Sequence, residues 1–163
     1  MKRTRLVVLK RVLEAVKIVD AIGSAAGRKT AQDMLFLLQV GGLPLDYDFQ
    51  WVSDKPYSKN LNQDLKELAE SEDSRDSHQL DLATHFEEKL RRAKRILSRP
   101  MSVGFSRPRW HSLLVACVAE IDKGKRTDLA RASFDRHLSA DQAGCVDIAM
   151  KHLSSYLRAR NSA

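Results

Sequence analysis

Apolar residues recur three and four positions apart along most of the chain, which is the spacing of a buried face on an α-helix. The apolar run "MLFLLQV" is hydrophobic nearly all round, so the helix that contains it is expected at the centre of the fold. The spacing predicts six or seven helices. They cover residues 5–22, 30–40, 58–70, 78–98, 110–123, 127–136 and 139–157.

Turn and capping residues mark where these helices are expected to begin and end. The small-residue stretch 23–27, "GSAAG", is expected to end the first helix, and Thr30 to cap the start of the second. Gly41 and Gly42 close the second helix, because glycine adopts the backbone conformation that ends one. Ser58 is a natural N-cap for the third helix.

Two segments have other patterns. Residues 43–52 alternate aromatic with polar side chains, which predicts one short strand or extended segment. In the helix that ends near Ser98, an apolar seam is spaced three, four, three and four residues apart, so this helix packs lengthwise against another helix of the domain or against a partner. The seam consists of Ala83, Phe86, Leu90, Ala93 and Leu97.

Composition agrees with a mainly-α fold class. The chain has 163 residues, 43% of them apolar and 30% charged, with few Gly (7) and Pro (4), which favours long helices over many turns. We predict one compact helical domain over residues 1–163, with lobes at 1–70 and 76–163 and at most one or two short strands. Apolar runs are too short for a membrane span and no signal peptide is expected, so we predict a cytoplasmic protein with no membrane partner.

One long stretch resembles a known family. Residues 27–70, "GRKTAQDMLFLLQVGGLPLDYDFQWVSDKPYSKNLNQDLKELAE", are similar to the YwgA-like family, distant relatives of the Panacea antitoxin-like group. In that family an apolar helix is followed by Gly-Leu-Pro-Leu, an aromatic segment, and Gly-Pro-Tyr-Ser at the start of the next helix. The later stretch "RWHSLLVACVAEID" resembles a second family helix. The family motif positions present here, all interpreted as structural, are Gln32, Phe36, Pro44, Pro56, Tyr57 and Ser58.

The resemblance implies a winged-helix-like N-terminal part, no known catalytic activity, and a setting in antiviral defence or toxin–antitoxin-like systems. Two departures bear on this. Lys55 stands where the family has Gly, and the polar segment 70–77 replaces the wing that usually follows the third helix. A reduced wing is therefore expected, which weakens the DNA-binding role that a winged helix suggests.

Candidate catalytic groups each have a structural interpretation. The five His and two Cys have none of the spacings of a metal site, and buried, reduced cysteines are expected. Glu120, Asp122 and Lys123 resemble the acidic-x-Lys core of metal-dependent nucleases, but they fall at the end of a predicted helix instead of on adjacent strands. No base is evident for Tyr57 or Ser58, so a tyrosine packed over a helix junction and an N-cap explain them. We predict no enzymatic activity, metal or cofactor.

Charge is the more informative property. The net charge is +7, yet residues 46–81 are mainly acidic, and Asp64, Glu67 and Glu70 make the third helix unsuited to contact DNA phosphates. Basic residues form two clusters on either side, which are solvated surfaces or phosphate-binding sites. The predicted nucleic-acid contacts are Lys2, Arg3, Arg5, Lys10, Arg11, Arg28 and Lys29 in the N-terminal cluster, and Lys89, Arg91, Arg92, Arg95, Arg99, Arg107 and Arg109 in the second cluster.

Two functional hypotheses follow from this pattern. The first is a non-enzymatic nucleic-acid-binding or regulatory module that contacts DNA or RNA through phosphates. The alternative is a protein–protein adaptor, or a subunit of a larger defence complex, whose polarised surface meets a protein encoded nearby and makes no direct nucleic-acid contact.

Overall fold

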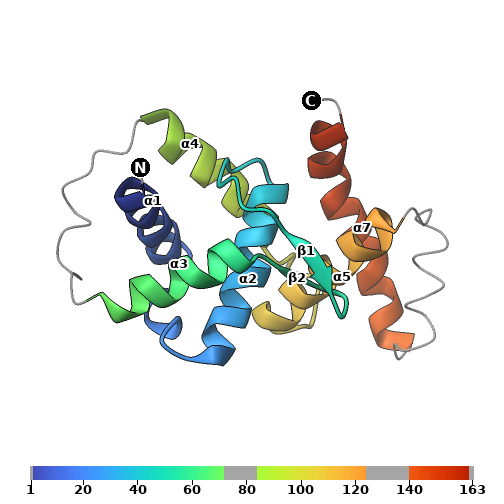
Figure 1. Cartoon of the computed structure of the whole chain (residues 1–163). Coiled ribbons are helices and arrows are strands. Elements are labelled where there is room, and N and C mark those ends of the chain that lie inside the picture. Colours follow the sequence, from blue (N-terminus) through green and yellow to red (C-terminus); the bar gives the residue numbers. More distant parts are fainter. Residues whose placement is uncertain (1, 72–83, 124–139, 162–163) are drawn as a thin grey trace.

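The computed structural model describes residues 2–71, 84–123 and 140–161, and these are mainly helical with one small antiparallel sheet (Figure 1). The predicted mainly-α fold class is therefore confirmed. The predicted helix over 127–136 and the capping role of Ser139 lie outside the described residues. In chain order the elements are α1 (Lys2–Ala15), η1 (Val19–Ala21), α2 (Ala25–Val40), β1 (Gln50–Val52), β2 (Lys55–Tyr57), α3 (Lys59–Glu70), α4 (Thr84–Ala93), η3 (Lys94–Leu97), α5 (Arg107–Asp122) and α7 (Ala140–Asn161).

Helix α2 is the centre of the molecule, as its apolar sequence predicts. It contacts α3, α4, η3, α5, α7 and strand β2. In Figure 1 it lies between α1, α3 and α4 on one side and α5 with α7 on the other. Burial on all sides excludes water from most of this helix, and its buried residues are Gly27, Ala31, Gln32, Met34, Leu35, Phe36, Leu37, Leu38 and Val40.

The buried apolar side chains form two clusters that share α2. One cluster joins α2 to α1, α3 and α4, and the other joins α2 to η3, α5 and α7. Leu97 contacts both clusters. The predicted seam residues Leu90 and Ala93 are buried in the first cluster, with Phe86 packed against it, so this part of the seam packs internally.

The first helix ends earlier than its apolar stripe predicts. Helix α1 stops at Ala15 instead of continuing to Ile22, because the chain turns through Lys17, whose φ is 62°. The Ile18 N–H donates to the Leu13 carbonyl and the Lys17 N–H to the Glu14 carbonyl, which is the Schellman ending of a helix. Lysine takes the left-handed position that glycine usually occupies, so the sequence carries no sign of this stop.

The second helix begins earlier than predicted, inside the stretch 23–27. Ser24 is its N-cap, and its hydroxyl oxygen accepts a hydrogen bond from the Gly27 N–H at 2.9 Å. Thr30 lies within the helix and donates to the Ala26 carbonyl, so the prediction that it caps the helix is wrong. A Cβ at Gly27 would lie 1.7 Å from the Ala21 carbonyl oxygen, so glycine is needed for this close approach. At the other end, Gly41 and Gly42 terminate α2 as predicted.

Of residues 43–52, predicted as one short strand or extended segment, only Gln50–Val52 pairs as β1. Before it the chain turns, because the Leu45 N–H donates to the Leu43 carbonyl and Asp46 has a φ of 56°. Strand β2, the partner of β1, follows a two-residue turn at Ser53 and Asp54, both with positive φ, as a type I′ hairpin requires. Trp51 lies opposite Pro56 in the register. This hairpin precedes α3, whereas the wing of the family pattern follows the third helix.

The helix predicted to run to about Ser98 changes form before its end. Helix α4 stops at Ala93, and the tighter 3₁₀ helix η3 continues to Leu97. At this point Gly41 packs closely against the Ala93 backbone. A Cβ on Gly41 would lie only 3.1 Å from the Ala93 carbonyl oxygen. Ile96 then enters the core that is shared by α5 and α7.

Candidate functional site

Part of the second basic cluster lines a groove. The cavity has a volume of about 410 Å³ and lies along α4 and η3 next to the end of α1. Arg91, Lys94 and Arg95 lie at helical spacing on its wall, and all three are exposed. Lys94 completes the set and belongs to the same basic cluster over residues 89–109. The remaining lining residues are Ala15, Glu87, Leu90 and Ser98.

One residue of the N-terminal cluster adjoins this groove. The Arg11 guanidinium donates from Nε to the Glu87 carboxylate at 3.1 Å, and both side chains are more than 40% exposed. Glu87 also lines the groove. The two predicted clusters therefore meet at one carboxylate, a proximity that 76 residues of separation concealed in the sequence.

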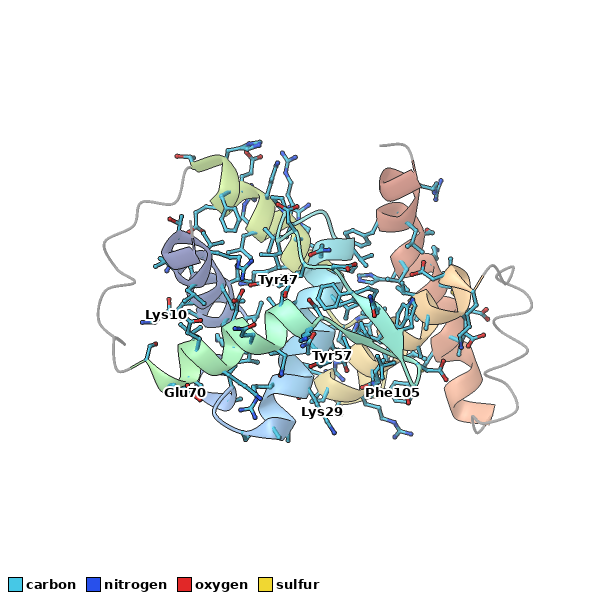
Figure 2. The ribbon with its side chains drawn as sticks, in the orientation of Figure 1. Lys10, Lys29, Tyr47, Tyr57, Glu70 and Phe105 are labelled. Carbon is cyan, nitrogen blue, oxygen red and sulfur yellow. The ribbon has the colours of Figure 1, made fainter. Side chains whose placement is uncertain are left out.

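The other described residues of the N-terminal cluster are spread over different surfaces. Lys10 is 9% exposed, and Arg5 is held by Asp64. Arg28 donates to the carbonyls of Ile22 and Gly23, and so closes the turn before α2. Lys29 is exposed on α2, far from Lys10 in Figure 2. The side chains of Lys2 and Arg3 lie outside the described residues.

The other basic residues of the second cluster also lie in different settings. Lys89 is half-buried, and Arg92 pairs with Glu88 one turn earlier on α4. Arg99 donates to the carbonyls of Val103 and Phe105, which fixes the loop before α5. At the start of α5, Arg107 is exposed, and the Arg109 guanidinium lies 4.8 Å from the centre of the Phe105 ring. The twelve predicted contacts whose side chains the structure describes are thus spread over several surfaces.

The carboxylate of Asp64 is buried, so the prediction that Asp64 lies on an exposed acidic face of α3 is wrong. Its side chain is 1% exposed and accepts two hydrogen bonds from Arg5, each 2.8 Å long, and one from the Tyr47 hydroxyl at 2.9 Å. Asp64 therefore adds no charge to the exposed face of α3. Burial, and then the bond to Asp64, raise the pKa of Tyr47 well above its usual range, so Tyr47 stays protonated and donates.

Gln32 and Ser58, two of the residues that carry the family resemblance, have structural roles. Ser58 caps α3 by accepting from the Leu61 N–H, as predicted. The Gln32 side chain donates to the Ser58 carbonyl and accepts from the Ser58 N–H, both at 3.0 Å and fully buried. Pro56 is buried and Pro44 exposed. Tyr57 is 39% exposed, and its packing over the helix junction stays a prediction.

A second glutamine on α2 holds the chain in the same way. Gln39 donates to the Tyr47 carbonyl at 2.9 Å and accepts from the Tyr47 N–H at 3.1 Å. Each glutamine side chain thereby pairs with both the backbone N–H and the backbone carbonyl of one residue, as a neighbouring strand would. Gln32 and Gln39 are seven residues apart, two helical turns, and this spacing was the available sign of their shared role.

Next to Gln39 lies a second cavity, of about 270 Å³, between α2, the hairpin and the end of α5. Phe36, Phe49 and Trp51 are its aromatic residues besides Tyr47. The Phe36 ring meets the other two edge to face, with centroids 5.3 Å from Phe49 and 5.2 Å from Trp51. From the sequence, Phe49 and Trp51 were predicted only as part of a strand or extended segment, and Phe36 only as a family motif position.

The nuclease-like residues tie this hairpin to the end of α5. Asp122 accepts from the Trp51 indole N–H at 3.3 Å, and Lys123 donates to Asp54 in the hairpin turn at 2.6 Å. Lys123 also lies 3.4 Å from Glu120. Glu120, Asp122 and Lys123 stand at the end of a helix, as predicted. The hydrogen bond to Asp54 raises the pKa of Lys123, so this side chain stays charged.

His111 bonds a backbone carbonyl, and the two cysteines are buried in the apolar core. His111 donates a hydrogen bond from Nε2 to the Leu97 carbonyl at 3.0 Å, because a carbonyl oxygen can only accept. Burial lowers the pKa of this ring. Cys117 and Cys145 are buried and free, as predicted, and burial raises the pKa of Cys117 to about 12. Among the described residues no group of three or more His, Cys, Asp or Glu could hold a metal ion.

A scan against protein-family models and searches of curated proteins and of solved structures find no match to this chain. The resemblance to the YwgA-like family consequently rests on the quoted motif residues. Within residues 2–71, 84–123 and 140–161, no helix has both the length and the apolarity that crossing a membrane requires.

Proposed function

We propose that the protein is a non-enzymatic nucleic-acid-binding module that holds a phosphate backbone in the groove along α4 and η3. The observation that carries the proposal is the convergence of Arg91, Lys94 and Arg95 on one cavity wall. Guanidinium and ammonium groups that neutralise phosphates release condensed counterions, which favours binding independently of base sequence.

The groove offers few competing acidic groups. Among the described residues that line it, Glu87 is the one carboxylate, and it is already bound to Arg11. A phosphate that approaches this wall meets three exposed cations and a fourth beside the carboxylate. Binding of this kind is positional and reads no bases, so we expect little sequence preference.

The test is the salt dependence of binding to a labelled duplex, a single-stranded DNA and a single-stranded RNA, measured by fluorescence anisotropy. We expect dissociation constants of about 10⁻⁴–10⁻⁶ M near physiological salt, as for non-specific binders. The double variant Arg91→Glu/Arg95→Glu should lose about tenfold or more in affinity, and the slope of log K against log salt should become shallower by about 2.

A matched control carries the same change in net charge on another surface. Lys59 and Lys66 are exposed on α3, and Lys59→Glu/Lys66→Glu should reduce affinity less than about threefold. Equal losses in the two double variants would mean that only net charge matters and would refute the groove as the site. Absence of binding by the wild-type chain at low salt would refute the function.

A protein–protein adaptor is the second candidate, because one observation favours it. Val52 and Tyr57, on the two strands of the hairpin, are 53% and 39% exposed. Exposed apolar side chains on a short sheet suit contact with a protein partner. On this hypothesis Tyr57→Glu abolishes co-purification with the product of a co-expressed neighbouring gene, while Arg91→Glu/Arg95→Glu leaves it intact.

A further inference from the structure

Aromatic side chains make up much of the lining of the cavity between α2 and the hairpin. Phe49 and Trp51 are two residues apart on an extended chain, so their side chains leave it on the same face. Both rings meet Phe36 nearly at right angles, with interplanar angles of 74° and 72°. The three rings line the cavity together with Tyr47, and the face of an aromatic ring attracts a cation.

The charge of the lining agrees with such a ligand. The chain as a whole has a net charge of +7, yet among the residues that the structure describes no Lys, Arg or His lines this cavity. Its charged residues are Asp48 and Asp122, both exposed at the rim, and its uncharged polar residues include Gln39 and Gln50. An anion would meet two carboxylates there, whereas a cation meets opposite charge and aromatic rings.

The walls are fixed before any ligand arrives. Phe36 is 6% exposed and belongs to the central helix α2. The Trp51 indole is held by its hydrogen bond to Asp122, and Gln39 holds the backbone at Tyr47. Preorganised walls reduce the entropy that binding costs.

We propose that this cavity binds the trimethylammonium group of a small molecule. A trimethylammonium ion has no N–H to satisfy and is weakly hydrated, so aromatic walls compensate its desolvation better than that of a primary ammonium ion. A cavity of about 270 Å³ accommodates one such headgroup with a short tail. The rim carboxylates favour a tail without negative charge. This proposal is independent of nucleic-acid binding, since the two cavities share no lining residue.

The test is calorimetric titration with choline and its neutral isostere 3,3-dimethyl-1-butanol, at matched ionic strength. Choline should bind about tenfold or more tightly than the isostere, which has the same shape without the charge. Ethanolamine and glycine betaine should both bind more weakly than choline, the first for its hydration and the second for its carboxylate. Equal affinity for choline and the isostere, or no heat from choline, would overturn the proposal.

Variants separate the role of the aromatic cavity from a general effect of charge or folding. Phe49→Leu keeps an apolar side chain but removes a ring face, and should weaken choline binding about tenfold while the thermal midpoint shifts only a little. Asp48→Asn should weaken it about two- to fivefold. Asp46→Asn is the matched control, because Asp46 is exposed near Asp48 but lines no part of the cavity, and asparagine tolerates its positive φ. An equal loss in the Asp46 and Asp48 variants would refute the site.

Discussion

The two cavities of this protein differ both in charge and in what holds their walls. The groove along α4 and η3 is basic, and its nearest ion pair, Arg11 with Glu87, is exposed on both sides. The cavity between α2 and the hairpin is aromatic and acidic, and it adjoins the part-buried hydrogen bonds between Gln39 and Tyr47 and the buried one between Tyr47 and Asp64. Exposed ion pairs contribute little to stability, whereas a buried polar group without its partner is costly.

This difference suggests different kinds of ligand. Long cationic side chains in water move easily and suit a flexible polyanion that needs no fixed geometry. Rings held by core packing, beside backbone that Gln39 fixes, suit a small ligand of one shape. Substitutions of the polar groups beside each cavity test whether the contrast in rigidity is real.

The largest effect is expected at Asp64. Asp64→Ala leaves the buried Tyr47 hydroxyl without its acceptor and removes the partner of Arg5, so we expect a loss of ~2–4 kcal/mol in the free energy of unfolding. Urea denaturation measures it. Glu70→Ala, on the exposed end of the same helix, is the control and should change stability by less than ~0.5 kcal/mol. A loss below ~1 kcal/mol at Asp64 would contradict a rigid interior there.

An intermediate effect is expected at Gln39. Gln39→Leu keeps the volume but removes both hydrogen bonds to the Tyr47 backbone, so we expect a loss of ~1–3 kcal/mol and weaker binding of choline. Unfolding and titration on the same sample test both expectations. Gln63→Leu changes an exposed glutamine of α3 in the same way and should leave both quantities nearly unchanged. Unaltered stability in the Gln39 variant would remove the argument that this cavity is preorganised.

The smallest effect is expected at the exposed pair beside the groove. Arg11→Ala should cost less than ~1 kcal/mol, because two hydrated side chains lose only a screened interaction. A double-mutant cycle with Glu87→Ala isolates the pair, and its coupling energy should shrink as salt is raised. A coupling as large as the loss at Asp64 would erase the contrast between the two cavities.

Local signals in the sequence located many of the elements. Ser58 as a cap and Gly41 with Gly42 as a stop were predicted correctly, because each acts through its own backbone and nearest turn. The ends at Ala15 and Ala25 were missed. Lys17 adopts a left-handed conformation that its side chain does not favour, and Ser24 lies in the small-residue stretch that was expected to end the first helix.

The candidate sites were predictable only in part. The basic residues of α4 were found from charge and spacing, but which of them line a groove depends on the position of α1. Arg5 was counted as a free cation and Asp64 as a surface acid, and the two neutralise each other from 59 residues apart. The aromatic cavity was missed, because its walls come from three separate segments, at Phe36, at Phe49 and Trp51, and at Asp122.

The sequence by itself determined the helical fold class, the central place of α2, the cap at Ser58 and the overall excess of positive charge. These follow from periodicity, local backbone chemistry and composition, which act over one or two turns of chain. Only the tertiary structure decided which charges are cancelled, which glutamines hold extended chain and which rings face one cavity. Those outcomes depend on contacts between residues far apart in sequence, and no local pattern specifies such contacts.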